Sequence, residues 1–122
     1  MLPNSSALYI IPVLPSSDIE RDLKWYDTYT GFTFLFGDKG YVGLKRDTLE
    51  FHLQFHHGNE EDPMIGGSVI KVFVPDIEPY FEEFVERGTI TKEKLRRNTP
   101  WGTHEFGFYD LNNNAIFIVQ DI

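Results

Sequence analysis

One stretch of the sequence, residues 49–56, alternates apolar side chains with side chains that could do chemistry. Its even positions are Glu50, His52, Gln54 and His56, and its odd positions are all apolar. Because successive side chains of a β-strand point to opposite sides, the pattern predicts a strand with one polar and one apolar face. Imidazole and carboxylate groups are common metal ligands and general acids and bases, so the polar face is the first place to look for a site.

The spacing along this predicted strand decides between those roles. Side chains two residues apart on a strand are roughly 7 Å apart, and those four apart, such as His52 and His56, are roughly 13 Å apart. These two imidazoles therefore cannot reach one ion without a bend in the strand. We interpret His52 as a hydrogen-bonding contact for a ligand, with Glu50 and Gln54 as polar neighbours.

The rest of the sequence carries no signature of a common catalytic site. It contains no GxSxG, HExxH, P-loop or GxGxxG motif. It also contains no cysteine, which excludes disulfides, thiolate catalysis and cysteine-based zinc sites. Whether the protein is an enzyme stays open on these grounds, and binding is favoured over catalysis.

Composition narrows the range of partners. The formal net charge of −8 argues against a nucleic-acid binder, which should carry a basic face, and it permits attraction of a cationic ligand. No apolar run approaches the roughly 20 residues of a membrane span, and the first residues lack the basic start of a signal peptide. We therefore expect a cytoplasmic protein that binds neither nucleic acid nor a membrane.

An internal repeat organises the chain. The triplet Asp-Ile-Glu occurs at 18–20 and again at 76–78, and each copy precedes a pattern of apolar residues at helical spacing. A glycine follows each pattern at a similar distance, Gly31 in the first copy and Gly88 in the second. Since glycine commonly ends helices, the sequence predicts two equivalent helices, each followed by strands.

The repeat predicts one domain over residues 1–122, built from halves at about 1–57 and 68–122 with a linker at 58–67. The order of strand, helix and further strands in each half predicts an α+β fold. In it, helices cover one face of a curved mixed sheet. The opposite face would then form a cup suited to holding a ligand.

Local signals set the expected bounds of the elements. A capping box of Ser17 and Glu20 is expected to start the first helix, directly after a turn at 14–17. The predicted strands are 8–13, 32–37, 41–46, 49–56, 68–74, 104–109 and 115–119.

Five segments of the chain carry a family resemblance: 11–20, 37–53, 74–88, Pro-Trp-Gly at 100–102, and 104–117 with Asp110. The most specific of these features are the Pro-Trp-Gly motif and the aspartate that opens the last turn. The segments resemble proteins of the glyoxalase and bleomycin resistance family, the vicinal oxygen chelate superfamily, and most closely its metal-free bleomycin resistance proteins. The resemblance implies two βαβββ modules per chain, with curved sheets that are completed in a homodimer.

The same resemblance bears on cofactors. Metalloenzymes of this superfamily take one metal ligand from each of four strands, and the resemblance places those positions at Ile11, His52, Val69 and Phe117. Only His52 has a side chain that can ligate a metal, whereas a catalytic metal needs three or four such ligands. The resemblance therefore implies a protein with no metal and no other cofactor.

The resemblance also implies a ligand crevice between two subunits, lined by aromatic rings on which flat ligands stack. A core position for Phe34 and an interface role for Trp101 stay open beside this interpretation. The candidate ligand-binding residues are the aromatic Phe34, Phe36, Tyr41 and Trp101 and the polar His52, Glu50, Gln54, Glu105 and Tyr109.

The function favoured by these observations is sequestration of a small molecule, without bond chemistry, by a cytoplasmic homodimer. A cationic aromatic drug such as bleomycin fits the acidic charge and the aromatic residues, and its capture would give antibiotic resistance. The alternatives are a metal-dependent lyase or dioxygenase of the same superfamily and a dimer with no ligand. The basic segment 92–97 is expected to be exposed rather than to close over the crevice.

Overall fold

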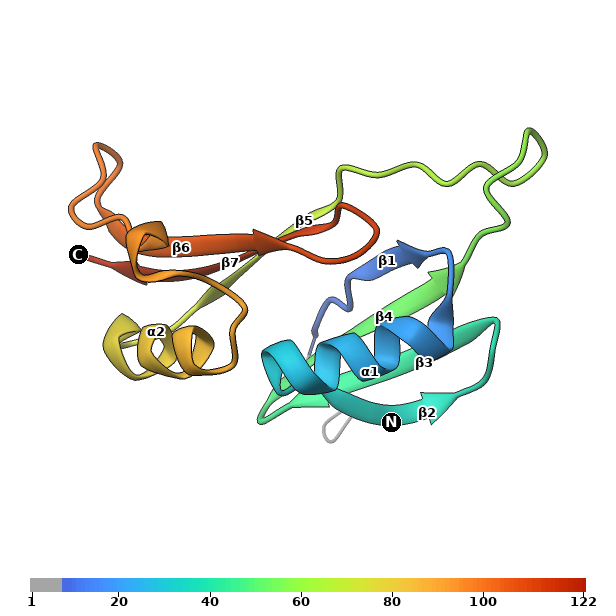
Figure 1. Cartoon of the computed structure of the whole chain (residues 1–122), viewed down its shortest axis with the longest axis horizontal. Coiled ribbons are helices and arrows are strands. Elements are labelled where there is room, and N and C mark those ends of the chain that lie inside the picture. The colour runs from blue at the N-terminus through green and yellow to red at the C-terminus, as the bar shows by residue number, and fades with distance from the viewer. Residues whose placement is uncertain (1–7) are drawn as a thin grey trace.

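The computed structural model describes residues 8–122 and repeats one order of elements in its two halves (Figure 1). A segment without helix or strand arches from one half to the other. The first half contains β1 (Val13–Ser16), α1 (Ile19–Thr30), β2 (Thr33–Gly37), β3 (Tyr41–Arg46) and β4 (Leu49–Phe55). The second contains β5 (Val69–Phe73), α2 (Ile77–Glu86), the short 3-10 helix η1 (Lys92–Lys94), β6 (Thr103–Tyr109) and β7 (Ala115–Asp121).

The strands form two mixed sheets of related topology. The first has the order β1-β4-β3-β2, and the second has the order β5-β7-β6. In both sheets the strand before the helix lies parallel to the last strand of its half, and the hairpins are antiparallel. The predicted α+β class with paired modules is thus confirmed. None of the helices in residues 8–122 has the length and apolar character that a bilayer span needs.

The first strand lies later than predicted, at Val13–Ser16 rather than 8–13. It pairs in parallel with β4, and the amide of His52 donates a hydrogen bond to the carbonyl of Pro12 just before it (2.9 Å). Pro15, which the sequence assigned to a turn, lies inside the strand. A proline is tolerated there because β1 is at the edge of its sheet, where a missing N–H breaks no ladder.

Helix α1 is capped by Asp18 and not by the predicted Ser17. The carboxylate of Asp18 accepts a hydrogen bond from the amide of Arg21 (3.1 Å), and its charge complements the positive end of the helix dipole. Ser17 instead donates from its amide and hydroxyl to the side-chain oxygen of Asn112, which belongs to the second half. Gly31 ends the helix with a φ of 76°, as its position in the sequence predicts.

Each half has a hydrophobic core beneath its helix, and the two cores meet. Phe51 of β4 is buried in the first core, as the alternation predicts. Ile116 of the second sheet is buried in that same core, and Ile70 and Phe108 pack against it. These three residues pair with one another across the second sheet, so they share its helix-bearing face. The halves are therefore joined through their helix sides, and the open faces of both sheets lie outside the junction.

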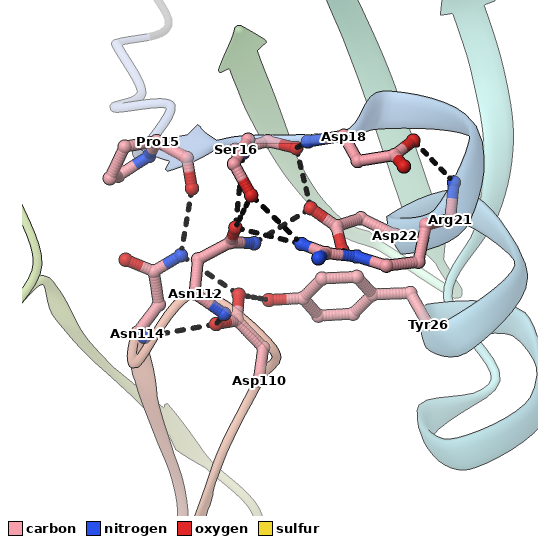
Figure 2. Close-up of polar contacts among 10 residues, drawn as sticks. Pro15, Ser16, Asp18, Arg21, Asp22, Tyr26, Asp110, Asn112 and Asn114 are labelled. Carbon is pink, nitrogen blue, oxygen red and sulfur yellow. Dashed lines mark hydrogen bonds and ion pairs between the residues drawn. The ribbon is translucent and has the colours of Figure 1, made fainter. Parts of the chain in front are cut away.

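The turn between β6 and β7 inserts buried polar groups into the first half (Figure 2). Asp110 accepts hydrogen bonds from the hydroxyl of Tyr26 (2.5 Å) and from the amides of Asn112 and Asn114 (2.8 and 2.9 Å). The side chain of Asn112 donates to Asp22 of α1 (2.7 Å). Because buried polar groups are costly unless they are hydrogen-bonded, this network fixes how the halves meet.

Two arginines also join the halves. Arg46 of β3 donates through two N–H groups to the carboxylate of Glu83 on α2 (2.7 and 2.5 Å) and to the carbonyl of Thr30 at the end of α1 (2.7 Å). Arg87 of the second half donates to the same carboxylate (2.7 Å) and to the carbonyls of Asp27 and Thr28 in α1 (3.2 and 3.0 Å). Burial alone would raise the pKa of Glu83, but the hydrogen bonds and charges of the two arginines bring it below its usual value.

Candidate functional site

Four of the predicted ligand-binding residues meet on the open face of the first sheet. The phenol oxygen of Tyr41 lies 2.6 Å from Nδ1 of His52, and Nε2 of His52 lies 2.6 Å from a carboxylate oxygen of Glu50. The ring of Phe36 stacks beside Tyr41, with centroids 6.4 Å apart, and meets the imidazole nearly at right angles at 5.0 Å. The group combines a chain of hydrogen bonds with an aromatic wall.

The partners of His52 indicate where its proton lies. A carboxylate can only accept, so Nε2 of the neutral imidazole donates to Glu50. Nδ1 is then an acceptor, and the hydroxyl of Tyr41 donates to it. The phenol oxygen of Tyr41 keeps its lone pairs for a donor group of a ligand.

A glycine makes room for the ring of Phe36. A β-carbon at Gly43 would lie 2.3 Å from Cε2 of Phe36, well inside van der Waals contact. Gly43 pairs with His52 across the sheet, so the missing side chain also brings the ring over the imidazole. Any other residue at this position would displace Phe36 from the group.

Phe34 does not join this group, although two residues so spaced on a regular strand would share a face. Strand β2 shifts its register against β3, so that Phe34 pairs with Leu44 and Phe36 pairs with Gly43. Leu44 is fully buried in the first core, which puts Phe34 on the helix side of the sheet and Phe36 on the open side. Phe34 remains more than half exposed at the edge and is not part of the core cluster.

Two polar candidates lie at the margins of the open faces. Gln54 pairs with Tyr41 on the first sheet and is exposed beside the hydrogen-bonded group. Tyr109 pairs with Ala115 on the second sheet and is largely exposed. Neither side chain forms a hydrogen bond with another described residue.

The remaining candidates, Trp101 and Glu105, form a clamp on the open face of the second sheet. The indole N–H of Trp101 donates to the carboxylate of Glu105 (2.9 Å), and the hydroxyl of Thr103 donates to the same oxygen (2.7 Å). Glu105 is only 4% exposed, whereas Trp101 is 54% exposed. Glu105 therefore positions the indole, a role different from the ligand contact expected from the sequence.

The groups around Glu105 keep its carboxyl ionised. Burial raises the pKa of this carboxyl, but the hydrogen bonds from Trp101 and Thr103 and the charges of Lys71 and Arg96 outweigh it and lower the pKa below its usual value. The carboxylate therefore stays ionised at neutral pH and keeps its hold on the indole.

Three neighbours of this clamp were not among the sequence candidates. The guanidinium of Arg96 lies 4.9 Å from the ring centre of Trp101, and the ammonium of Lys71 lies 6.0 Å from the ring centre of Phe117. Lys71 lies two residues from both Val69 and Phe73 on β5, so these three side chains share one face of the strand. This spacing is a sequence signal that places Lys71 on the open face. Arg96 pairs with Glu105 across a bridge that local patterns could not predict.

The four positions of the superfamily metal site do not fit a metal ion here. Ile11, Val69 and Phe117 carry no donor atom, and both nitrogens of His52 are within hydrogen-bond distance of Tyr41 and Glu50. Within residues 8–122, no group of three or more histidine and acidic side chains is arranged to hold an ion. The donor set thus differs from that of the metalloenzymes, and a cofactor-free protein remains the prediction.

Comparison with known proteins gives a consistent set of relatives, although no family model matches the sequence. A bleomycin resistance protein of Geobacillus stearothermophilus is 22% identical, with the match covering 94% of this chain and 98% of that protein. The structure of a bleomycin resistance determinant encoded on transposon Tn5 has a TM-score of 0.77 at 20% identity and covers 94% of this chain and 98% of its own. A bleomycin-binding protein complexed with bleomycin has a TM-score of 0.76 at 20% identity, covering 95% and 100%.

Proposed function

We infer that this chain, which has the fold of the bleomycin resistance proteins, is a metal-free small-molecule binding protein that works as a homodimer. Its role would be to sequester a ligand that contains a flat aromatic ring, in the cytoplasm and without forming or breaking a bond. Bleomycin is the first ligand to test, because the relatives named for it match nearly the whole chain.

The observation that carries this proposal is the exposed aromatic surface on both open faces. Phe36 on the first sheet is exposed, and Phe73, Trp101 and Tyr109 on the second sheet are exposed as well. Large apolar patches on a soluble protein usually mark an interface or a ligand groove. In a symmetric dimer, the open face of the first sheet of one protomer could lie against the open face of the partner's second sheet. The symmetry would form this contact two times, so that all four open faces are covered.

The two faces would then supply different contacts to one ligand. Phe36 and Trp101 offer flat rings for stacking, and the phenol oxygen of Tyr41 offers an acceptor. Glu50 holds His52, and Glu105 holds Trp101, so the contact groups are ordered before the ligand arrives. Such preorganisation lowers the entropic cost of binding.

Calorimetric titration with bleomycin tests the proposal, and β2 offers a matched pair of variants. Phe36→Ala and Phe34→Ala remove the same ring from the same strand, on the open side and the helix side respectively. We expect Phe36→Ala and Trp101→Ala each to weaken binding about tenfold or more, since they remove central aromatic contacts, and Phe34→Ala to leave it within about threefold.

Unchanged affinity in both Phe36→Ala and Trp101→Ala would show that the ligand does not lie between these faces. A lack of heat at high micromolar bleomycin would remove the bleomycin resistance function. Metal analysis of protein purified without chelators separates the metal-dependent enzyme alternative, because stoichiometric zinc, iron or nickel would contradict a metal-free binder.

A further inference from the structure

Arg96 differs from every other arginine of the chain. In residues 8–122 it is the one arginine with no carboxylate within ion-pair distance, although the chain has 19 acidic and 11 basic residues. Its guanidinium lies over the ring of Trp101 instead. The four that are paired with carboxylates are Arg21, Arg46, Arg87 and Arg97.

Lys71 repeats this arrangement on β5, at the opposite edge of the second sheet from Arg96. Its ammonium lies over the ring of Phe117, and it has no ion-pair partner among the described residues. The ring of Phe117 occupies the space left by Gly107, where a β-carbon would lie 2.5 Å from it. Lys71 and Phe117 pair directly across the second sheet, so cation and ring share its open face.

The indole of Trp101 is both exposed and fixed. A buried carboxylate, that of Glu105, and the hydroxyl of Thr103 hold its position, and Arg96 lies over one side of the ring. An exposed tryptophan without a ligand gains little from being clamped in this way. A rigid, solvent-facing ring is instead what stacking on a flat ligand requires.

We propose that the open face of the second sheet binds a flat aromatic ring bearing an acidic group, with Trp101 stacking on the ring and Lys71 and Arg96 holding the acid. This inference rests on the proposed function, because it concerns the same crevice, and it names a ligand class that differs from the cationic bleomycin. Two cations without carboxylate partners, each above an aromatic ring, complement an anion attached to an aromatic system.

This assignment opposes the one that net charge suggests. A charge of −8 attracts cations at long range, and the sequence therefore favoured a cationic ligand. Once a ligand is bound, its electrostatic interaction with the protein depends mainly on the charged groups near it, because salt screens distant exposed charges. Glu105 offsets part of the two positive charges, since Lys71 and Arg96 lower the pKa of its carboxyl. Its carboxylate is buried and already accepts from Trp101 and Thr103, and neither Lys71 nor Arg96 donates a side-chain hydrogen bond to another described residue.

Three naphthalene compounds of similar shape test the inference: naphthalene-2-sulfonate, neutral 2-naphthalenemethanol and cationic 2-naphthylmethylammonium. Titration calorimetry on the wild-type dimer should give about tenfold tighter binding of the sulfonate than of the ammonium compound. The double variant Lys71→Met/Arg96→Gln should lose that preference and keep its affinity for the neutral compound within about threefold. The matched control Lys24→Met/Arg97→Gln removes the same two charges elsewhere and should retain the preference.

The outcomes separate the two levels of the argument. Equal or tighter binding of the ammonium compound by the wild type overturns the inference while leaving a binding protein, and so does a sulfonate preference that survives in Lys71→Met/Arg96→Gln. If that variant instead dissociates the dimer in sedimentation experiments, the cations hold an acidic side chain of the partner, and the inference is also wrong. Failure of all three compounds and of bleomycin to bind contradicts the proposed function itself.

Discussion

The two open faces show how one module can be used for two kinds of contact. Gly43 and His52 face each other on the first sheet, and Gly107 and Phe117 face each other at the same place on the second. In both sheets an aromatic ring covers the glycine. The first sheet adds hydrogen-bonding groups at this place, whereas the second adds cations and a clamped indole. The backbone supplies the position, and the residue types supply the chemistry.

The β3–β4 and β6–β7 turns differ in burial more strongly than the two open faces differ from each other. Asp110 in the β6–β7 turn is 5% exposed and joins the halves, whereas the side chain of Asp47 in the β3–β4 turn is 77% exposed. The second half therefore carries the groups that fix the junction. The first half presents its corresponding turn to solvent.

The largest expected effect on stability comes from removing the charge of the buried turn residue Asp110. Asp110→Asn should lower the free energy of unfolding by roughly 3 kcal/mol, because an amide cannot accept from all the donors that now surround the carboxylate. Asp47→Asn, the same change in the exposed turn, should cost less than about 0.5 kcal/mol. Urea denaturation measures both, and similar losses would contradict the distinction between the turns.

The similarity of the two faces predicts the next effect. Gly43→Ala and Gly107→Ala should each destabilise by about 1–3 kcal/mol, because the new β-carbon would overlap the ring of Phe36 or Phe117. Gly40→Ala serves as the control, since its β-carbon would meet nothing closer than 3.6 Å and its φ is ordinary. A thermal melt in which only one of the two central glycines matters would show that the faces are not built alike.

The smallest expected effects on stability come from neutralising Glu105 and Glu50, the two carboxylates that position Trp101 and His52. Glu105→Gln should cost about 1–2 kcal/mol and loosen Trp101, because the buried acceptor loses its charge. Glu50→Gln should cost less, since Glu50 is partly exposed. Tryptophan fluorescence anisotropy and urea denaturation at pH 7 measure both, and an unchanged anisotropy in Glu105→Gln would remove its positioning role.

The carboxyl of Glu105 predicts that stability depends on pH. Its folded-state pKa lies below the usual value, so its contribution to stability is present above about pH 4.3 and is lost as the pH falls through the folded value. The stability difference between the wild type and Glu105→Gln should therefore shrink below about pH 4. A difference that grows on acidification would give the shift the opposite sign.

Much of the fold follows from local patterns in the sequence, and the misses have non-local causes. Alternation along 49–56 predicted which side of β4 is buried, and the repeated Asp-Ile-Glu triplet predicted both helices. The bounds of β1 depend on pairing with β4, which lies far along the chain. The separation of Phe34 from Phe36 depends on a register shift against β3, which strand periodicity does not reveal.

The candidate site divides in the same way. Strand alternation indicates Glu50 and His52, and the turn and the resemblance indicate Phe36 and Tyr41. Strand pairing brings these four residues together, and their role in binding stays a prediction. Local patterns do not indicate Lys71 and Arg96 as a pair, because these residues lie at opposite edges of the second sheet, on β5 and on the segment bridged to β6. The basic segment that contains Arg96 was expected to be exposed, and Arg96 is exposed, yet it lies over an aromatic ring rather than in solvent alone.

Mixing two variants tests most directly whether the crevice is made of two different faces from two protomers. Phe36→Ala damages the first open face, and Trp101→Ala damages the second. When the two are unfolded together and refolded, half of the dimers should be mixed, and each mixed dimer should regain one intact crevice. With bleomycin or naphthalene-2-sulfonate as the probe, whichever the wild type binds, we predict about one quarter of the wild-type number of sites, with wild-type affinity. No recovery in dimers shown to be mixed would contradict a crevice shared between protomers.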